Sequence, residues 1–125
     1  IKEDVHSKTL LVVEDDSLVT EMLQETLNVL GHKSVCVENG KEALALYEKQ
    51  GEEFDAVILD MNMPIMGGKE TFKALQQINA DVKVIISSGY SAEHTVSELL
   101  ASGVYSIISK PYKIADIDEA IRALP

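Results

Sequence analysis

TLLVVEDD, at residues 9–16, joins a short, largely apolar run to three consecutive acids. A continuous apolar run of this length predicts a strand that is buried on both faces, as in a parallel sheet. Downstream, residues 17–30 carry apolar side chains at helical spacing, and Gly31 ends the pattern. The stretch therefore predicts a buried strand followed by a helix, with acids at the turn between them.

The same alternation of strand and helix patterns continues to the end of the chain. Further strands are predicted at 33–37, 54–59, 82–87 and 106–109, and further helices at 41–50, 69–79, 91–102 and 112–124. Such alternation favours an α/β fold, a doubly wound parallel sheet with helices on both faces, because right-handed crossovers permit little else. We predict the flavodoxin-like (βα)5 strand order 2-1-3-4-5, the commonest solution for this length.

Length and composition favour a single domain. The chain has 125 residues, and we interpret 1–8 as a leader or linker and 9–125 as the domain, cut from a longer protein. One cysteine excludes an internal disulfide and favours a cytoplasmic setting. No apolar stretch is long enough for a membrane helix. The formal net charge of -10 argues against direct nucleic-acid binding.

Acids follow two strands that are neighbours in the predicted order. Glu14 and Asp15 follow the first strand, and Asp60 follows the third. Parallel strands end at one edge of a sheet, where ligands gather, so these carboxylates should converge. Mg²⁺ suits such a set, with Asp15 and Asp60 as direct ligands and Glu14 acting through water. The alternative is solvated loop acids, and Asp16 is interpreted as a helix cap.

Two further polar residues follow the remaining strands at the same edge. Ser88 follows the fourth strand, and Lys110, followed by Pro111, comes after the fifth. Each is ordinary alone, but a hydroxyl, a lysine and several acids at one edge suit phosphoryl transfer, which requires positioning and charge neutralisation. Asp60 is the predicted nucleophile and would give an acyl phosphate.

Four motifs in order, LLVVEDD (10–16), DMNMPIMGG (60–68), SSGY (87–90) and SKP (109–111), resemble the receiver domains of two-component response regulators and hybrid histidine kinases. The resemblance covers nearly the whole chain. It implies a Mg²⁺-dependent phospho-accepting signalling switch rather than a classical enzyme. Asp60 would be the phosphoacceptor, Glu14 and Asp15 the acidic pair, Asn62 a metal ligand through its carbonyl, and Ser88 and Lys110 the phosphoryl-binding hydroxyl and amine.

The resemblance also implies a phosphohistidine donor, on a histidine kinase or a histidine phosphotransfer protein. A homodimer that forms on phosphorylation is consistent with it. One position departs from the family: Ile107 stands where an aromatic switch residue is usual, three residues before Lys110. Tyr105 lies two residues earlier, and strand alternation would point it the same way. The switch candidates are therefore Ser88, Ile107 and Tyr105.

Two other classes of function fit the sequence less well. A pseudo-receiver would serve only as an interaction scaffold, and the complete polar set argues against it. A flavin protein would need a loop rich in small polar residues after the first strand, where this chain has three acids. A haloacid-type phosphatase would need an aspartate two residues after the nucleophile, where this chain has Asn62.

Overall fold

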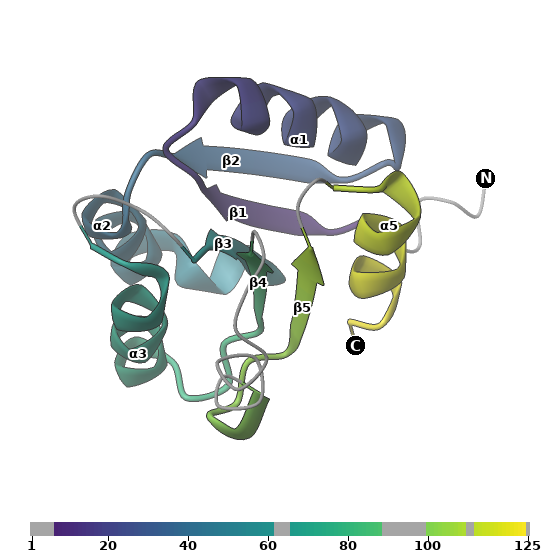
Figure 1. Ribbon diagram of the computed structural model, residues 1–125. Helices are drawn as coiled ribbons and strands as arrows, with labels where there is room; N and C mark the ends of the chain where they lie inside the picture. Colours follow the sequence, from purple (N-terminus) through teal and green to yellow (C-terminus); the bar gives the residue numbers. More distant parts are fainter. Residues whose placement is uncertain (1–6, 62–65, 89–99, 110–111, 125) are drawn as a thin grey trace.

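A computed structural model of the protein describes residues 7–61, 66–88, 100–109 and 112–124. Its strands form one parallel sheet in the order β2-β1-β3-β4-β5 (Figure 1). Their bounds are β1 (Thr9–Val13), β2 (Lys33–Val37), β3 (Ala56–Asp60), β4 (Val84–Ser88) and β5 (Ser106–Ser109). The predicted flavodoxin-like order is confirmed.

Helices cover both faces of this sheet, α1 and α5 on one side and α2 and α3 on the other (Figure 1). Their bounds are α1 (Ser17–Val29), α2 (Gly40–Gln50), α3 (Gly68–Ile78) and α5 (Ile114–Arg122), with a 3₁₀ turn, η2 (Gly51–Glu53), after α2. The helix predicted at 91–102 lies almost wholly outside the described residues. None of the described helices is both long and apolar enough to cross a bilayer.

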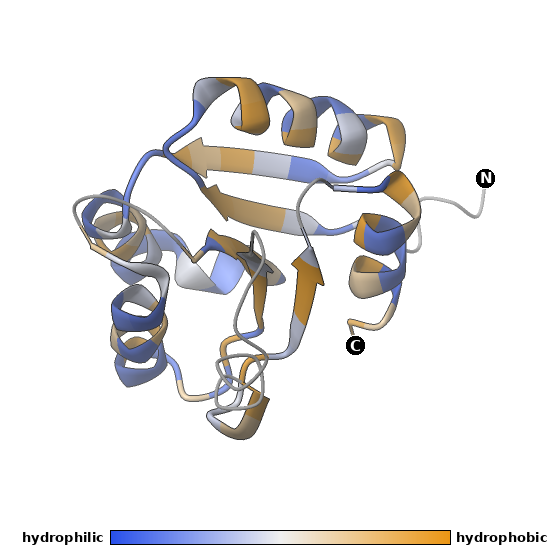
Figure 2. Cartoon of the chain, viewed as in Figure 1, coloured by the Kyte–Doolittle hydropathy of each residue, from blue (hydrophilic) through white to orange (hydrophobic). Residues whose placement is uncertain are grey.

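The core consists of two apolar clusters, one on each face of the sheet. Leu11, Val57 and Ile86 point toward α2 and α3, whereas Leu10 and Ile58 point toward α1 and α5. This division follows from the strand period of two, which sends successive side chains to opposite faces. Figure 2 shows the apolar colouring of the central strands and the mixed colouring of the helices that cover them. Burial on both faces explains why the strand sequences are continuously apolar.

Asp16 and Gly31 define the two ends of α1, one at each edge of the sheet. Asp16 Oδ1 accepts hydrogen bonds from the amides of Leu18 at 2.9 Å and Val19 at 3.4 Å, so the predicted cap of α1 is confirmed. Gly31 ends the α1 region with φ of 94°, a conformation that favours glycine. These ends fix where the chain leaves β1 and returns to β2.

Some predicted bounds were wrong by one or two residues. β3 begins at Ala56 rather than 54, because η2 holds the preceding chain and the Phe54 amide donates to the Gly51 carbonyl at 3.1 Å. β3 also continues through Asp60, so the predicted nucleophile is the last residue of the strand rather than the first of a loop. Its backbone is therefore held by the sheet.

Candidate functional site

Asp60 is fixed at the carboxyl end of β3. It lies opposite Ser87 of β4 in the parallel ladder, and the amide of Met61 donates to the Ser87 carbonyl at 3.0 Å. Only 3% of Asp60 is exposed. Pairing with β4 therefore gives this carboxylate a defined position at the sheet edge.

Glu14 and Asp15 reach the same edge from the turn after β1. The Glu14 amide donates to the Val37 carbonyl at 3.1 Å, which ties the turn to β2, and Glu14 Oε2 accepts a hydrogen bond from the Asp16 amide at 3.2 Å. Glu14 is 3% exposed, whereas Asp15 is exposed. The acidic turn thus contributes one buried and one accessible carboxylate.

These acids converge as predicted. Carboxylate oxygens of Glu14, Asp15 and Asp60 lie within 4.8 Å of one another. Among the described residues, this is the group of acidic, histidine or cysteine side chains with spacing for a metal ion. Three carboxylate oxygens form the hard, anionic donor set that suits a small divalent cation such as Mg²⁺, which also keeps some of its waters. The chemistry of the donors therefore fits this ion.

The other predicted site residues are only partly described. Ser88 is the last residue of β4, and its backbone pairs with Ser109 of β5. Its side chain, like Asn62 and Lys110, lies outside the described part of the structure. The roles assigned to these three residues stay predictions.

One prediction about the switch candidates was wrong. Ile107 packs against the cluster beneath α2 and α3, whereas Tyr105 packs against the cluster beneath α1 and α5. The Tyr105 hydroxyl donates to the carbonyl of Ala123, at the end of α5. Strand alternation does not apply to Tyr105, because β5 begins only at Ser106. Tyr105 and Ile107 therefore do not share a face, and Tyr105 cannot stand in for an aromatic at position 107.

Gly68 has a role that motif reading did not assign. Its amide donates to the Met61 carbonyl at 3.1 Å, and an added Cβ would lie 2.7 Å from the Asp60 carbonyl oxygen. The first turn of α3 thus rests directly on the backbone of the predicted acceptor. The signal in the sequence is the Gly67–Gly68 pair that ends the motif at 60–68.

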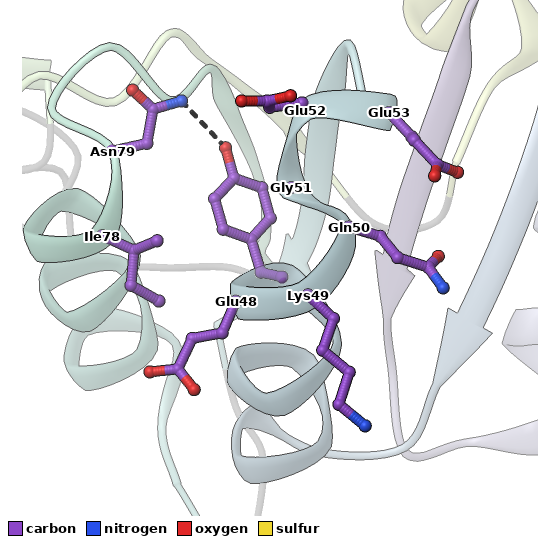
Figure 3. A pocket seen from close by; sticks show the side chains of 9 residues that line it. Glu48, Lys49, Gln50, Gly51, Glu52, Glu53, Ile78 and Asn79 are labelled. Carbon is purple, nitrogen blue, oxygen red and sulfur yellow. Dashed lines mark hydrogen bonds between the residues drawn. The ribbon is translucent and has the colours of Figure 1, made fainter.

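A larger hollow lies at the opposite, amino edge of the sheet. It has a volume of about 560 Å³ and is lined by the ends of α2 and α3 and by η2. In Figure 3, Asn79 reaches across it to donate to the Tyr47 hydroxyl at 3.1 Å. The hollow beside Glu14 and Asp15 measures about 160 Å³. Cavity size therefore does not single out the convergent carboxylates.

Comparison with known proteins agrees with this geometry. A sequence model of the family described as "Response regulator receiver domain" matches residues 10–122. The chain belongs to the response regulator receiver family. It is a phospho-accepting module of two-component signalling, as the sequence motifs predicted.

Individual relatives cover most of this receiver domain. Two-component response regulator 24 of Arabidopsis thaliana is 34% identical over 112 residues, 89% of this chain and 80% of that protein. Sporulation initiation phosphotransferase F of Bacillus subtilis is 30% identical over 116 residues, 93% and 92% of the two chains. The receiver domain of sensor histidine kinase PA1611 from Pseudomonas aeruginosa has the same fold, with a TM-score of 0.84 at 21% identity over 94% and 97% of the chains. The chain spans half or less of the length of several other curated relatives.

Proposed function

We propose that this receiver domain accepts a phosphoryl group on Asp60 from a phosphohistidine, in a reaction that depends on Mg²⁺. The observation that carries the proposal is the convergence of Glu14, Asp15 and Asp60 within 4.8 Å at the carboxyl edge. Asp60 is the member of this set at the end of a central strand, so the sheet holds it in place for attack.

The chemistry is a displacement at phosphorus. A carboxylate oxygen of Asp60 attacks, an O–P bond forms, and the P–N bond of the phosphohistidine breaks. The electron pair of that bond leaves with the imidazole. The product is an acyl phosphate, and the protein's own contribution is position and charge rather than covalent chemistry.

The acidic cluster fits Mg²⁺, which would neutralise charge on the phosphoryl oxygens when bound. Asp15 and Asp60 would hold the ion directly, Glu14 through water, and Asn62 through its carbonyl. The related PA1611 receiver domain is described with a magnesium ion in its active-site cleft. Ser88 and Lys110 would bind the remaining phosphoryl oxygens, as a hydroxyl donor and a compact point charge.

The partner would be a histidine kinase or a histidine phosphotransfer protein. Relatives of this chain include Sensor kinase CckA of Brucella abortus, 29% identical over 118 residues. The receiver unit would comprise residues 9–125, with 1–8 as a leader, and the family match at residues 10–122 supports this extent of the unit. The domain would work in the cytoplasm and would bind neither nucleic acid nor membrane directly. A phosphorylation-dependent homodimer would follow from a change at the surface beside the site.

The test is phosphorylation by a small acyl phosphate with and without Mg²⁺, followed by intact mass. Wild-type protein should gain one phosphoryl group only with Mg²⁺, and hydroxylamine should remove it. Asp60→Asn should lose this gain by at least about 100-fold, since no other carboxylate takes the nucleophile's place. Asp81→Asn changes an exposed acid in the turn before β4 and should be labelled like the wild type.

Full labelling of Asp60→Asn would contradict the assignment of the acceptor. If the wild type binds no Mg²⁺ and no donor labels it, including a phosphohistidine protein, the alternative of a receiver that serves only as an interaction scaffold is correct.

A further inference from the structure

A side-chain hydrogen bond joins the end of β4 to the chain just before α5. It is shared by the hydroxyls of Ser87 and Tyr112. Ser87 is fully buried at 0% exposure, and Tyr112 packs against the apolar cluster beneath α1 and α5. Tyr112 lies two residues before Ile114, where α5 begins. The bond therefore ties β4 to the segment that enters α5, on the face of the sheet covered by α1 and α5.

Ser87 is at the same time the direct neighbour of the proposed acceptor. It lies opposite Asp60 in the ladder, and its carbonyl accepts from the amide of Met61 at 3.0 Å. On its other side it pairs with Ile108 of β5. One residue thus contacts the acceptor strand through its backbone and the entry of α5 through its hydroxyl.

The order of residues along the chain gives this link a chemical meaning. Ser109 pairs with Ser88 of β4, and Tyr112 is bonded to Ser87 of the same strand. Only two residues, Lys110 and Pro111, separate these two anchors in the sequence. The residues that flank the dipeptide with the predicted phosphoryl-binding lysine are therefore both anchored to β4, the strand next to the acceptor strand.

We propose that Ser87 and Tyr112 are a positioning pair for phosphoryl transfer, which sets Asp60 and the segment entering α5 in one fixed arrangement. The inference rests on the proposed function of Asp60. Neither residue of the pair touches the phosphoryl group. They act through the backbone of β3 and β4 and through the chain on either side of the lysine.

Loss of the shared bond should slow the reaction without weakening the metal site. Tyr112→Phe keeps the ring in its apolar cluster and removes only the hydroxyl, and Ser87→Ala removes the other partner. Small misplacements of reacting groups slow transfer strongly, so each variant should lower the maximal rate of phosphorylation about 3- to 10-fold. The Kd for Mg²⁺ should stay within about twofold, because the carboxylates are unchanged. The double variant should be no slower than the slower single variant, as expected for one shared interaction.

The experiment uses the whole chain, a small acyl phosphate and saturating Mg²⁺, with intact mass followed over time and Mg²⁺ affinity measured by calorimetry. Tyr47→Phe is the matched control: it also removes a hydrogen-bonded tyrosine hydroxyl, one bonded to Asn79 at the amino edge. It should be destabilised to a similar extent and yet keep the wild-type rate.

The proposal is wrong if Tyr112→Phe reacts at the wild-type rate, if Tyr47→Phe is slowed equally, or if the effects of Ser87→Ala and Tyr112→Phe multiply. In each of these cases the wild type is labelled and Asp60 remains the acceptor. An unlabelled wild type would overturn the proposed function itself, and this inference with it.

Discussion

Acidic side chains gather at both edges of the sheet, but the two groups differ in geometry. At the amino edge, Glu48, Glu52 and Glu53 are exposed and line the hollow of about 560 Å³. At the carboxyl edge, Glu14 and Asp60 are each 3% exposed and, with the third acid there, lie within 4.8 Å of one another. The acids at the carboxyl edge, beside the smaller hollow, therefore lie close together and include two buried carboxylates, whereas those at the amino edge are exposed.

The difference shows that convergence and burial, rather than acidity or cavity size, mark a site of chemistry. An exposed carboxylate stays hydrated and costs the fold almost nothing. A carboxylate removed from water, and held beside others, costs free energy unless a cation or hydrogen bonds compensate. The chain bears this cost at the edge where a cation and a phosphoryl group would be bound, as the receiver family requires.

The largest contrast between the two edges should appear in Mg²⁺ affinity. Asp15→Asn removes a proposed direct ligand, and Glu14→Gln removes one that acts through water. Each should weaken Mg²⁺ binding by about 10- to 100-fold, the range known for changes around a metal's ligands. Glu53→Gln, a matched change at the amino edge, should leave the affinity unchanged. Calorimetric titration of the four proteins with MgCl₂ measures the effect.

Equal weakening by Glu53→Gln and Glu14→Gln would mean that overall negative charge, not the cluster, attracts the ion. Salt distinguishes the two explanations further, because long-range attraction is screened at about 0.15 M ionic strength, where the Debye length is about 8 Å. The contrast between the edges should survive at that concentration.

A smaller effect should follow from the packing beneath Asp60. In Gly68→Ala, the new Cβ would lie 2.7 Å from the Asp60 carbonyl oxygen and 2.8 Å from the Met61 Cα, so the acceptor backbone must shift. We expect destabilisation of about 1–3 kcal/mol, as for other overpacked positions, together with slower phosphorylation. Gly67→Ala is the control, since nothing lies within 4 Å of its Cβ position. Urea unfolding and the labelling rate test both.

If Gly68→Ala keeps the wild-type stability and rate, the backbone of the acceptor is less constrained than the packing indicates. A loss in Gly67→Ala of the same size would point to helix initiation instead, because both residues lie at the start of α3.

Much of the carboxyl edge was predictable from the sequence, for a physical reason. The central strands are covered by helices on both faces, so successive residues such as Leu11 and Val12 are all buried. Continuous apolar runs in the sequence therefore mark the strands, and the residue after each run marks the carboxyl edge of the sheet. The convergence of Glu14 with Asp60 then follows from strand order alone. The amino edge has no such pattern, and η2 was missed there.

Contacts that depend on side-chain direction could not be predicted in the same way. Tyr105 was assigned to the face of Ile107 by alternation, but it precedes the first residue of β5 and bonds to the end of α5 instead. The Ser87–Tyr112 bond joins residues 25 positions apart whose sequence gives no sign of contact. Such links depend on how helices dock on the sheet, which local patterns do not encode.

The smallest expected effect belongs to the amino edge and concerns stability rather than chemistry. His32, 9% exposed just before β2, accepts a hydrogen bond at Nδ1 from the Lys8 amide at 3.0 Å. Burial lowers its pKa below the ordinary value of 6.5, an effect opposed by Asp118 and reinforced by the nearby Lys8. A neutral imidazole is what the bond requires, because protonated Nδ1 cannot accept it.

The sign of the pH effect follows from this lowered pKa. Between the folded pKa and about 6.5, the unfolded chain binds more protons than the folded one, so stability rises with pH. The contribution of His32 is thus complete above about pH 6.5 and is lost as the pH falls toward the folded pKa. We expect a loss of about 0.5–1.5 kcal/mol, the net contribution of one hydrogen bond.

Urea unfolding of the wild type and of His32→Asn at pH 7.5 and 5.5 isolates this contribution from that of the carboxylates. The side-chain carbonyl oxygen that the variant introduces can accept from the Lys8 amide at either pH, so the variant should lose less stability than the wild type on acidification. If the two proteins lose the same amount, the imidazole does not titrate in this range, and the acids of the carboxyl edge account for the pH dependence. Because Mg²⁺ would bind those acids and not His32, repeating the comparison with saturating Mg²⁺ should reduce their share and leave the difference between wild type and variant intact.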